Sequence, residues 1–224
     1  MFEQKPLIAI PLNDENIYKN IDIAKEKGAD IIELRIDQFN KINIEEIINI
    51  LKYIKAKDLK SISTIRSEKE GGKFIQNRYE IFKEIVKYTD IIDIELTSFD
   101  IREKVIKLAK ENGKYALISY HDFEKTPDNI QQIINQAYNL GADIIKFAFK
   151  ANSFEDVAKI LCITNQNKDK NIVAIAMGDY GKISRLAGFV FGSLITYSFL
   201  GEAFASGQIQ IDKLIEDMKF YNLR

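Results

Sequence analysis

Residues 28–32 read Gly28-Ala-Asp-Ile-Ile32, and the same five residues recur as Gly141-Ala-Asp-Ile-Ile145. A shorter echo is Thr89-Asp-Ile-Ile92. In each copy a glycine or a short polar turn follows a helix-like segment, and an isoleucine-rich run typical of a buried strand begins. This repeated pattern predicts a chain in which helices and buried strands alternate.

Runs rich in isoleucine and valine occur along the whole chain. Most of them lack strict polar alternation, as expected of parallel strands that are covered on both faces. We expect strands at residues 7–12, 31–36, 61–65, 91–96, 115–120, 144–149 and 172–177, with an eighth candidate at 189–194. Between these runs, apolar residues recur at helical spacing, for example Ile44, Ile47, Ile48 and Leu51.

Eight strand–helix units in a chain of 224 residues favour an α/β fold of the (β/α)8 barrel type. No tract rich in proline, glycine and serine divides the chain, so we expect residues 1–224 to form a single catalytic domain. A doubly wound open sheet is the alternative fold. The sequence contains neither the Gly-x-Gly-x-x-Gly fingerprint nor the Walker A motif of such sheets.

The composition excludes several classes of partner. The 32 basic and 33 acidic residues give a formal net charge of -1, which leaves no basic excess for a nucleic acid backbone. One cysteine and one histidine rule out a disulfide framework and a zinc-ligand pattern. No apolar run approaches the roughly 20 residues needed to cross a bilayer, and no secretory signal begins the chain. We therefore expect no membrane partner and a cytoplasmic location.

Polar residues gather at the carboxyl ends of the expected strands, which is where a barrel carries its substrate site. They are Glu33, Arg35, Arg66, Asp93, Glu95, His121 and Lys146. Each residue alone also has a structural interpretation: Glu33 and Arg35 would form a buried ion pair, and other strand-end charges would be solvated. The convergence of five strands on polar ends favours a functional site.

Lys146 and His121 carry the most chemical information. Lys146 interrupts the apolar run 144–149, where lost hydration would lower its pKa and free its amine as a nucleophile, with nearby arginines acting in the same direction. His121 is the one histidine of the chain, so any imidazole acid–base role falls on it. Adjacent strand ends would then place a base beside a Schiff-base carbon. The alternatives are a lysine that extends to the rim and a surface histidine.

A series of motifs on these strand ends resembles the type I 3-dehydroquinate dehydratase family. The motifs occur in the family order: Glu33-Leu-Arg-Ile-Asp37, Thr64-Ile-Arg-Ser67 with Glu70-Gly-Gly72, Asp93-Ile-Glu95, Ser119-Tyr-His-Asp-Phe123 with Thr126-Pro127, Gly141-Ala-Asp143 with Lys146, Met177-Gly178, Ser184-Arg-Leu-Ala-Gly188, Phe191-Gly-Ser193 and Gly207-Gln-Ile209. Each fragment is modestly specific. Together they cover almost the whole chain and are highly specific.

The resemblance implies a (β/α)8 barrel that dehydrates 3-dehydroquinate to 3-dehydroshikimate without a metal or cofactor. This reaction is the third step of the shikimate pathway toward chorismate and the aromatic amino acids. The resemblance also implies that Lys146 forms an imine with the C3 ketone and that His121 removes the C2 proton and helps to expel the C1 hydroxyl. Glu70 matches the carboxylate that orients the histidine.

The same resemblance implies a set of substrate-binding residues and a homodimer. Arg185 matches the residue that pairs with the substrate carboxylate, for which a guanidinium fork is suited. The positions that contact substrate hydroxyls or shape the pocket are matched by Glu33, Arg35, Arg66 and Gln208. Asp93 matches an acid that lies behind the groups in contact with substrate.

One loop departs from the family pattern. Members often carry Ser-Ala-Pro-Gly-Gln where this chain has Phe204-Ala-Ser-Gly-Gln208. Phe204 replaces a hydroxyl donor and Ser206 replaces a proline, while Gln208 is retained. We expect a lid over about residues 201–208 with changed substrate affinity and unchanged chemistry. The opposite expectation is that Phe204 packs as an apolar latch.

Two other functions fit parts of the pattern. A class I aldolase would also use Lys146 for a Schiff base, but it would break a carbon–carbon bond. A noncatalytic barrel that binds small acids would keep Arg66 and Arg185 but would not require Lys146, His121 and Glu70. Product analysis separates the first alternative from dehydration, and borohydride trapping separates the second.

Overall fold

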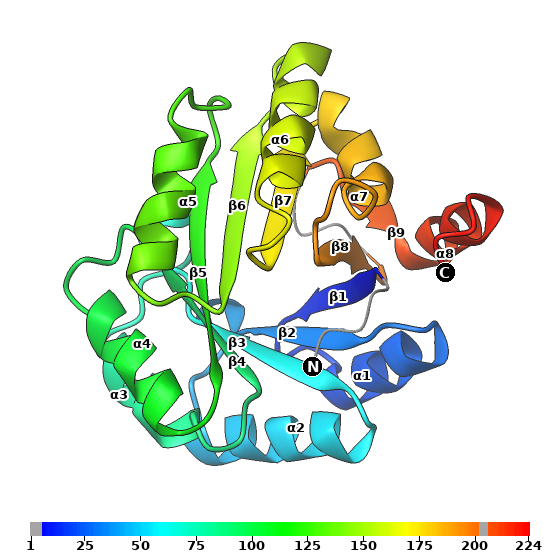
Figure 1. The fold of residues 1–224 in the computed structure, drawn as a ribbon. Coiled ribbons are helices and arrows are strands. Elements are labelled where there is room, and N and C mark those ends of the chain that lie inside the picture. The colour runs from blue at the N-terminus through cyan, green and yellow to red at the C-terminus, as the bar shows by residue number, and fades with distance from the viewer. Residues whose placement is uncertain (1–5, 202–205) are drawn as a thin grey trace.

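The computed structural model describes residues 6–201 and 206–224, and its helices and strands alternate along the chain (Figure 1). The strands are β1 (Leu7–Leu12), β2 (Ile31–Arg35), β3 (Lys60–Thr64), β4 (Ile91–Glu95), β5 (Tyr115–Asp122), β6 (Ile144–Lys150), β7 (Ile172–Met177), β8 (Ile195–Phe199) and the short β9 (Ile209–Gln210). The α-helices are α1 (Ile17–Glu26), α2 (Ile44–Ala56), α3 (Arg78–Ile85), α4 (Arg102–Glu111), α5 (Ile130–Asn139), α6 (Phe154–Gln166), α7 (Ser184–Ala187) and α8 (Ile211–Phe220). Three short 3-10 helices lie at Ile36–Gln38, Glu68–Glu70 and Tyr180–Ile183.

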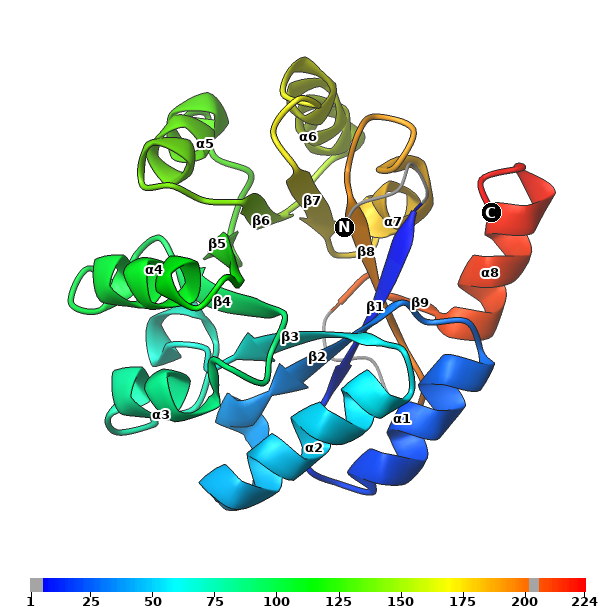
Figure 2. The ribbon, with the colours of Figure 1, turned by 60° about the horizontal axis from the view of Figure 1, so that its bottom comes forward.

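The strands form one parallel sheet that curls into a barrel. Its order is β7-β6-β5-β4-β3-β2-β1-β8-β9, so β1 pairs with both β2 and β8. The curled sheet closes where the N–H of Leu194, directly before β8, donates to the carbonyl oxygen of Ile172 in β7 at 2.7 Å. Figure 2 shows the helices arranged around the outside of the strands. The expected α/β barrel of one domain is therefore confirmed.

Side chains alternate between the inside and the outside of the barrel, because successive residues of a strand point to opposite faces. The outward residues pack against helices such as α2, whose buried face carries Ile47, Ile50, Leu51 and Ile54. The inward apolar residues form a separate cluster of Leu7, Ala9, Ile31, Ile62, Ile91, Leu117, Ile144, Ala148, Val173, Ile175, Met177, Ile195 and Tyr197. No helix in the described part of the chain is long and apolar enough to cross a membrane.

The eighth strand lies later in the chain than expected. Residues 189–194 form turns rather than a strand, with Val190 64% exposed and Gly192 in a left-handed conformation at φ 99°. The actual strand β8 alternates between the barrel interior, reached by Ile195 and Tyr197, and outward polar residues such as Thr196. Because of this alternation β8 lacks the continuous apolar run by which the other strands were identified.

The interior of the barrel changes from apolar to polar along the strands. In β6, Ile144 belongs to the apolar layer and Lys146 follows two residues later on the same face. In β4, Ile91 is followed in the same way by Asp93 and then by Glu95. The fold thus brings the polar residues of several strands together at the carboxyl end of the barrel.

Candidate active site

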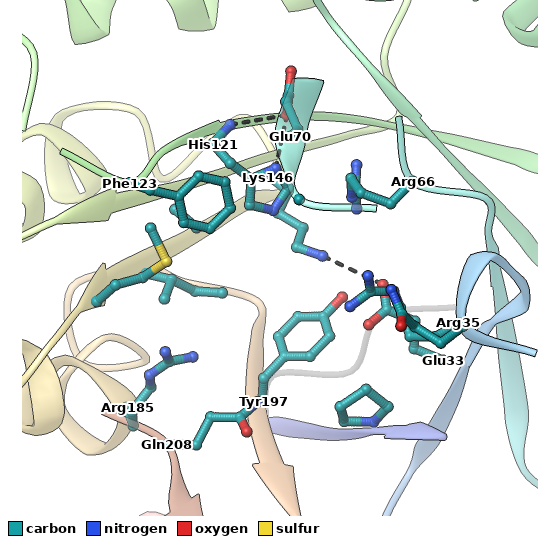
Figure 3. A pocket seen from close by; sticks show the side chains of 16 residues that line it. Glu33, Arg35, Arg66, Glu70, His121, Phe123, Lys146, Arg185, Tyr197 and Gln208 are labelled. Atoms are coloured by element: carbon teal, nitrogen blue, oxygen red, sulfur yellow. Dashed lines mark hydrogen bonds and ion pairs between the residues drawn. The ribbon is translucent and has the colours of Figure 1, made fainter. Parts of the chain in front are cut away.

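A cavity of about 370 Å³ opens at the carboxyl ends of the strands (Figure 3). All eight residues that the sequence assigned to the site line this cavity: Glu33, Arg35, Arg66, Glu70, His121, Lys146, Arg185 and Gln208. Among its other lining residues are Phe123, Met177 and Tyr197. The cavity joins residues from β1 to the segment after β8, which are far apart in the sequence.

Lys146 extends from β6 into the centre of this cavity and is 5% exposed. Its Nζ lies 3.4 Å from Glu33 Oε1 and 3.3 Å from Asp93 Oδ2. Burial lowers the pKa of Lys146, but the negative charges of Glu33 and Asp93 outweigh burial and raise that pKa overall. The expectation of a lowered pKa is therefore wrong for the unliganded site, because the sequence did not reveal the two carboxylates beside the amine.

Arg66 connects the acids on the neighbouring strand β4. Its Nη1 and Nη2 donate to the two oxygens of Asp93 at 3.0 and 2.7 Å, and Nη1 also donates to Glu95 Oε1 at 3.1 Å. Ser119 accepts from Arg66 at 2.6 Å and donates to Asp93 at 2.6 Å. Although burial opposes ionisation, Arg66 and Lys146 lower the pKa of Asp93 far below its usual value. Asp93 is thus an ionised partner of both cations.

Glu33 and Arg35 point into the site but do not form the ion pair considered from the sequence. Arg35 instead donates from Nε and Nη2 to the two oxygens of Asp37, at 3.1 and 2.8 Å. Glu33 accepts from the hydroxyl of Thr64 at 2.8 Å and from Lys146. The turn of the 3-10 helix after β2 returns Asp37 to Arg35, which explains why Glu33 is left to face Lys146.

His121 and Glu70 form a hydrogen-bonded dyad at the rim of the cavity. Glu70 Oε2 lies 2.8 Å from His121 Nδ1 and accepts from the backbone N–H of His121 at 3.1 Å. Glu70 Oε1 accepts from the hydroxyl of Thr97. Burial raises the pKa of Glu70 to about 7. Burial and the charges of Arg66 and Lys146 hold the pKa of His121 well below its ordinary value.

The neutral imidazole that these charges favour is suited to act as a base. If Nδ1 of His121 carries the proton and donates it to Glu70, the lone pair of Nε2 is free. The ring of His121 stacks on Phe123, with centroids 6.0 Å apart and planes inclined by 10°. Glu70 and Phe123 therefore orient the ring from two sides.

The loop that carries Glu70 is folded tightly against the end of β3. The N–H of Gly72 donates to the carbonyl oxygen of Ser67 at 3.0 Å. A Cβ at Gly72 would lie 1.9 Å from the carbonyl oxygen of Arg66, far inside contact distance. Ser67 N–H also donates to Glu95 Oε1 at 3.0 Å. Glycine at position 72 therefore allows the close approach that places Glu70 beside His121.

Arg185 supplies a cation on the other side of the cavity. It is 3% exposed, and burial lowers its pKa to about 10. Nε of Arg185 has no hydrogen-bond partner, and no carboxylate within residues 6–201 and 206–224 forms an ion pair with this side chain. A buried guanidinium in this state is suited to bind an anion with two oxygens.

The segment that carries Gln208 packs on the turn after β7. Gly178 N–H donates to the carbonyl oxygen of Ser206 at 3.3 Å. Gly207 has φ 81°, and a Cβ there would lie 2.5 Å from the carbonyl oxygen of Gly178. This close approach of two backbones holds Gln208 against the cavity. Phe204, on which the lid expectation depends, lies outside the described residues.

Tyr197 is a lining residue of the cavity that sequence reasoning missed. Lys146 Nζ lies 4.3 Å from the centroid of its ring. The residue was overlooked because the eighth strand was expected at 189–194. The alternation of Ile195, Thr196 and Tyr197 is the signal by which an inward-facing tyrosine can be found.

The cavity thus combines an amine, an imidazole held by a carboxylate, and an anion-binding guanidinium. An amine can form a covalent imine with a carbonyl compound, and an adjacent imidazole can move a proton. The protein therefore has the features of a barrel enzyme that forms a Schiff base with an acidic substrate.

Comparisons with known proteins agree with this class. The model of the family "Type I 3-dehydroquinase" matches residues 8–222. The 3-dehydroquinate dehydratase of Aquifex aeolicus is 50% identical over 220 residues, covering 97% of this chain and 100% of the relative. Its crystal structure has a TM-score of 0.90 and covers 96% of this chain and 99% of its own. A type I enzyme from Clostridium difficile, solved with covalently modified comenic acid, has 32% identity, a TM-score of 0.89 and coverages of 99% and 94%.

The chain belongs to the type I 3-dehydroquinate dehydratase family. It is accordingly a hydro-lyase of the Schiff-base type, with 3-dehydroquinate dehydratase activity in the shikimate pathway.

Proposed function

We propose that 3-dehydroquinate binds in the cavity around Lys146 and that Lys146, His121 and Glu70 carry out its dehydration. The observation that carries this proposal is that one cavity is lined by an amine, an imidazole–carboxylate dyad and a guanidinium that forms no ion pair with a described residue. These are the groups needed to form an imine, move a proton and hold a carboxylate. Residues 1–224 would act as one catalytic domain.

The first step joins Lys146 to the C3 ketone of the substrate. The ammonium held by Glu33 and Asp93 must lose a proton before Nζ attacks, and the two carboxylates are the nearest acceptors. Loss of water from the addition product gives an iminium ion. Its positive charge acidifies the C2 proton, since the electrons left behind are delocalised as an enamine.

The second step moves a proton at C2 and expels the hydroxyl at C1. We infer that Nε2 of His121 removes the C2 proton while Nδ1–H donates to Glu70. The resulting imidazolium then gives its proton to the departing C1 oxygen, which leaves as water. Hydrolysis of the conjugated imine releases 3-dehydroshikimate and restores Lys146. His121 thus ends the cycle in the state in which it began.

Four further residues orient the substrate in this proposal. Arg185 pairs with its carboxylate, because its buried guanidinium meets no other anion among the described residues. Glu33 and Arg35 contact its hydroxyls, and Gln208 closes the other side. Arg66 acts mainly through Asp93, which it holds by two hydrogen bonds. Asp93 lies behind Lys146 and balances its charge.

Incubation with 3-dehydroquinate tests the proposal. We expect the ultraviolet absorbance of a conjugated enone to rise and 3-dehydroshikimate to be the product. Cleavage of a carbon–carbon bond would instead indicate an aldolase. A folded protein that binds the substrate, gives no product and forms no adduct with borohydride would be a noncatalytic binder.

We also propose a homodimer, which the family resemblance implies, and a cytoplasmic location, which was expected from the composition. Light scattering during size-exclusion chromatography measures the mass in solution. A mass of about twice the 25.8 kDa of the chain supports the dimer, and a mass equal to that of one chain contradicts it.

A further inference from the structure

Tyr197 carries a buried hydroxyl that has no well-aligned hydrogen-bond partner among the described residues. The side chain comes from β8, and the residue is 4% exposed. No well-aligned hydrogen bond reaches its Oη from the described residues, and the ammonium of Lys146 is the polar group that interacts with it. A buried polar group in this state costs free energy, and native proteins seldom keep one without a reason. This Oη therefore points to a ligand that supplies the missing bond.

The direction of this hydroxyl identifies the part of the cavity it serves. The ring of Tyr197 faces Lys146 Nζ at 4.3 Å from its centroid. Figure 3 shows the phenolic oxygen directed toward Lys146 and Glu33 and away from Gln208. Burial and the charge of Glu33 raise the pKa of Tyr197. The phenol therefore keeps its proton at any working pH and is available as a hydrogen-bond donor.

We propose that Tyr197 is a further substrate-binding residue, whose hydroxyl donates a hydrogen bond to the substrate hydroxyl on C4, next to the carbon that Lys146 attacks. The inference rests on 3-dehydroquinate as the substrate. Because C3 bonds to Nζ, the neighbouring hydroxyl on C4 must lie close to Lys146 and to the side chains around Nζ. Tyr197 and Glu33 are both directed toward this part of the cavity.

Tyr197 and Glu33 offer complementary hydrogen bonds to one hydroxyl. A carboxylate only accepts, so the proton of the substrate hydroxyl goes to Glu33. A lone pair of the same oxygen then remains and accepts from Tyr197 Oη. The aromatic ring below adds a second effect, since its face attracts the positive iminium formed at Nζ. The hydroxyl of Tyr197 thus helps to bind the substrate, and its ring stabilises the covalent iminium intermediate.

A matched pair of substrates tests the hydroxyl. Tyr197→Phe keeps the ring and should raise KM for 3-dehydroquinate about 3–10-fold, the range of one ordinary hydrogen bond, with a smaller change in kcat. For the 4-deoxy analogue, which has no hydroxyl to accept the bond, the same variant should leave KM within twofold of wild type. The comparison is internal to each protein sample and does not depend on the fraction that is folded.

The Tm of the free enzyme separates a role in substrate binding from a structural role, because loss of a structural hydrogen bond would lower Tm. Because Oη makes no well-aligned hydrogen bond to the described residues, Tyr197→Phe should leave Tm unchanged or raise it. Tyr53→Phe is the matched control, since the hydroxyl of Tyr53 in α2 bonds both oxygens of Asp22 at 3.0 Å. That control should lower Tm slightly and leave KM for both substrates unchanged.

Three results would overturn the proposal. The first is an unchanged KM for 3-dehydroquinate in Tyr197→Phe, and the second is an equal change for both substrates. The third is loss of activity in Tyr197→Leu with none in Tyr197→Phe, which would assign the whole effect to the ring. Turnover of 3-dehydroquinate by the wild-type enzyme is measured alongside, so failure of this inference is distinguishable from failure of the proposed substrate.

Discussion

Lys146 is held as an ammonium ion between two carboxylates, and this state governs when it can react. The amine needs a nearby base to become a nucleophile, and Glu33 lies 3.4 Å away. The carboxylate of Glu33, whose charge keeps Lys146 protonated, is therefore well placed to accept the proton of Lys146 when substrate arrives. Burial assists by removing the water that would otherwise stabilise the charge.

Trapping with borohydride tests the nucleophile. In the presence of substrate or product, borohydride should inactivate the protein irreversibly and add mass to the peptide that contains Lys146. Lys146→Ala should abolish the adduct, and Lys146→Arg should not restore it because guanidinium stays protonated. Peptide mass spectrometry measures the site of modification. An adduct on another lysine would refute the assignment.

The single histidine makes the pKa of His121 directly measurable. One imidazole C2–H signal is expected by NMR, and it should titrate below pH 6.5 because burial and the charges of Arg66 and Lys146 disfavour the imidazolium. Lys146→Met should raise this pKa by removing one of those charges. A signal that titrates above 6.5 would contradict the electrostatic argument.

Removal of the imidazole should have a large effect on turnover. His121→Ala should lower kcat by roughly 10²–10⁴-fold, the usual contribution of a general acid–base group. Borohydride should still trap an imine, because Lys146 is intact. Quenched assays measure imine formation from the amount of adduct and dehydration from the amount of product. Near-normal turnover would require a different base.

Glu70 should make stability fall as the pH rises. Its folded pKa of about 7 lies above the ordinary value of 4.5, so between these values the folded state binds more protons than the unfolded state. Above pH 7 the penalty is complete, on the order of 3 kcal/mol at most. Glu70→Gln should therefore raise Tm more at pH 8 than at pH 5, while kcat falls. A difference in Tm independent of pH would show that the buried charge is not its cause.

At the scale of elements, the loop between β3 and α3 sets the catalytic geometry. The loop carries Glu70 and packs on the backbone of Arg66. It is held in place by the hydrogen bond that the N–H of Ser67 donates to Glu95. Glu95 also binds Arg78 at the start of α3, at 2.6 Å. The entry and the exit of the loop are thus held by one buried carboxylate.

Gly72→Ala tests this loop. The added Cβ must displace the loop or Arg66, so Glu70 should move away from His121 and kcat should fall at least as much as in Glu70→Gln. Gly113→Ala is the control, because its Cβ would meet nothing within 4 Å and only its φ of 66° is strained. The control should lose stability and keep its kcat. Equal kcat losses in both variants would exclude a specific role for the loop.

At the scale of the molecule, the residues that stabilise the barrel and the residues of the active site occupy different levels along the barrel axis. The lower interior layers are apolar, and the charged layer lies above them at the carboxyl end. The apolar layers exclude water beneath Lys146, which strengthens every interaction of the charges above. The outer helices complete the separation by covering the other face of each strand.

Leu117→Ala tests the separation. Leu117 is fully buried in the barrel interior, one layer below the site, and its truncation should cost about 2–5 kcal/mol of stability. KM for 3-dehydroquinate and borohydride trapping at Lys146 should stay close to wild type at a temperature where the variant is folded. Denaturant unfolding and steady-state kinetics measure the two effects. A tenfold rise in KM would show that the layers are coupled.

Much of this architecture was predictable from the sequence. Seven of the eight barrel strands lie where continuous apolar runs predicted them, because a strand buried on both faces needs such a run. The eighth escaped because Thr196 and Ser198 interrupt its apolar residues. The members of the site were predictable from strand ends and from the order of family motifs, and all eight line the cavity.

The sequence by itself determined the alternation of helices and strands, the single histidine and the lysine within an apolar strand, since these depend on local order along the chain. The tertiary structure decided which charges meet. Arg35 pairs with Asp37 rather than Glu33, and two carboxylates reverse the expected pKa shift of Lys146. Tyr197 enters the site only through barrel closure. The contacts of Lys146 and Tyr197 join residues from different strands, and their distances depend on strand register, which no one-dimensional pattern contains.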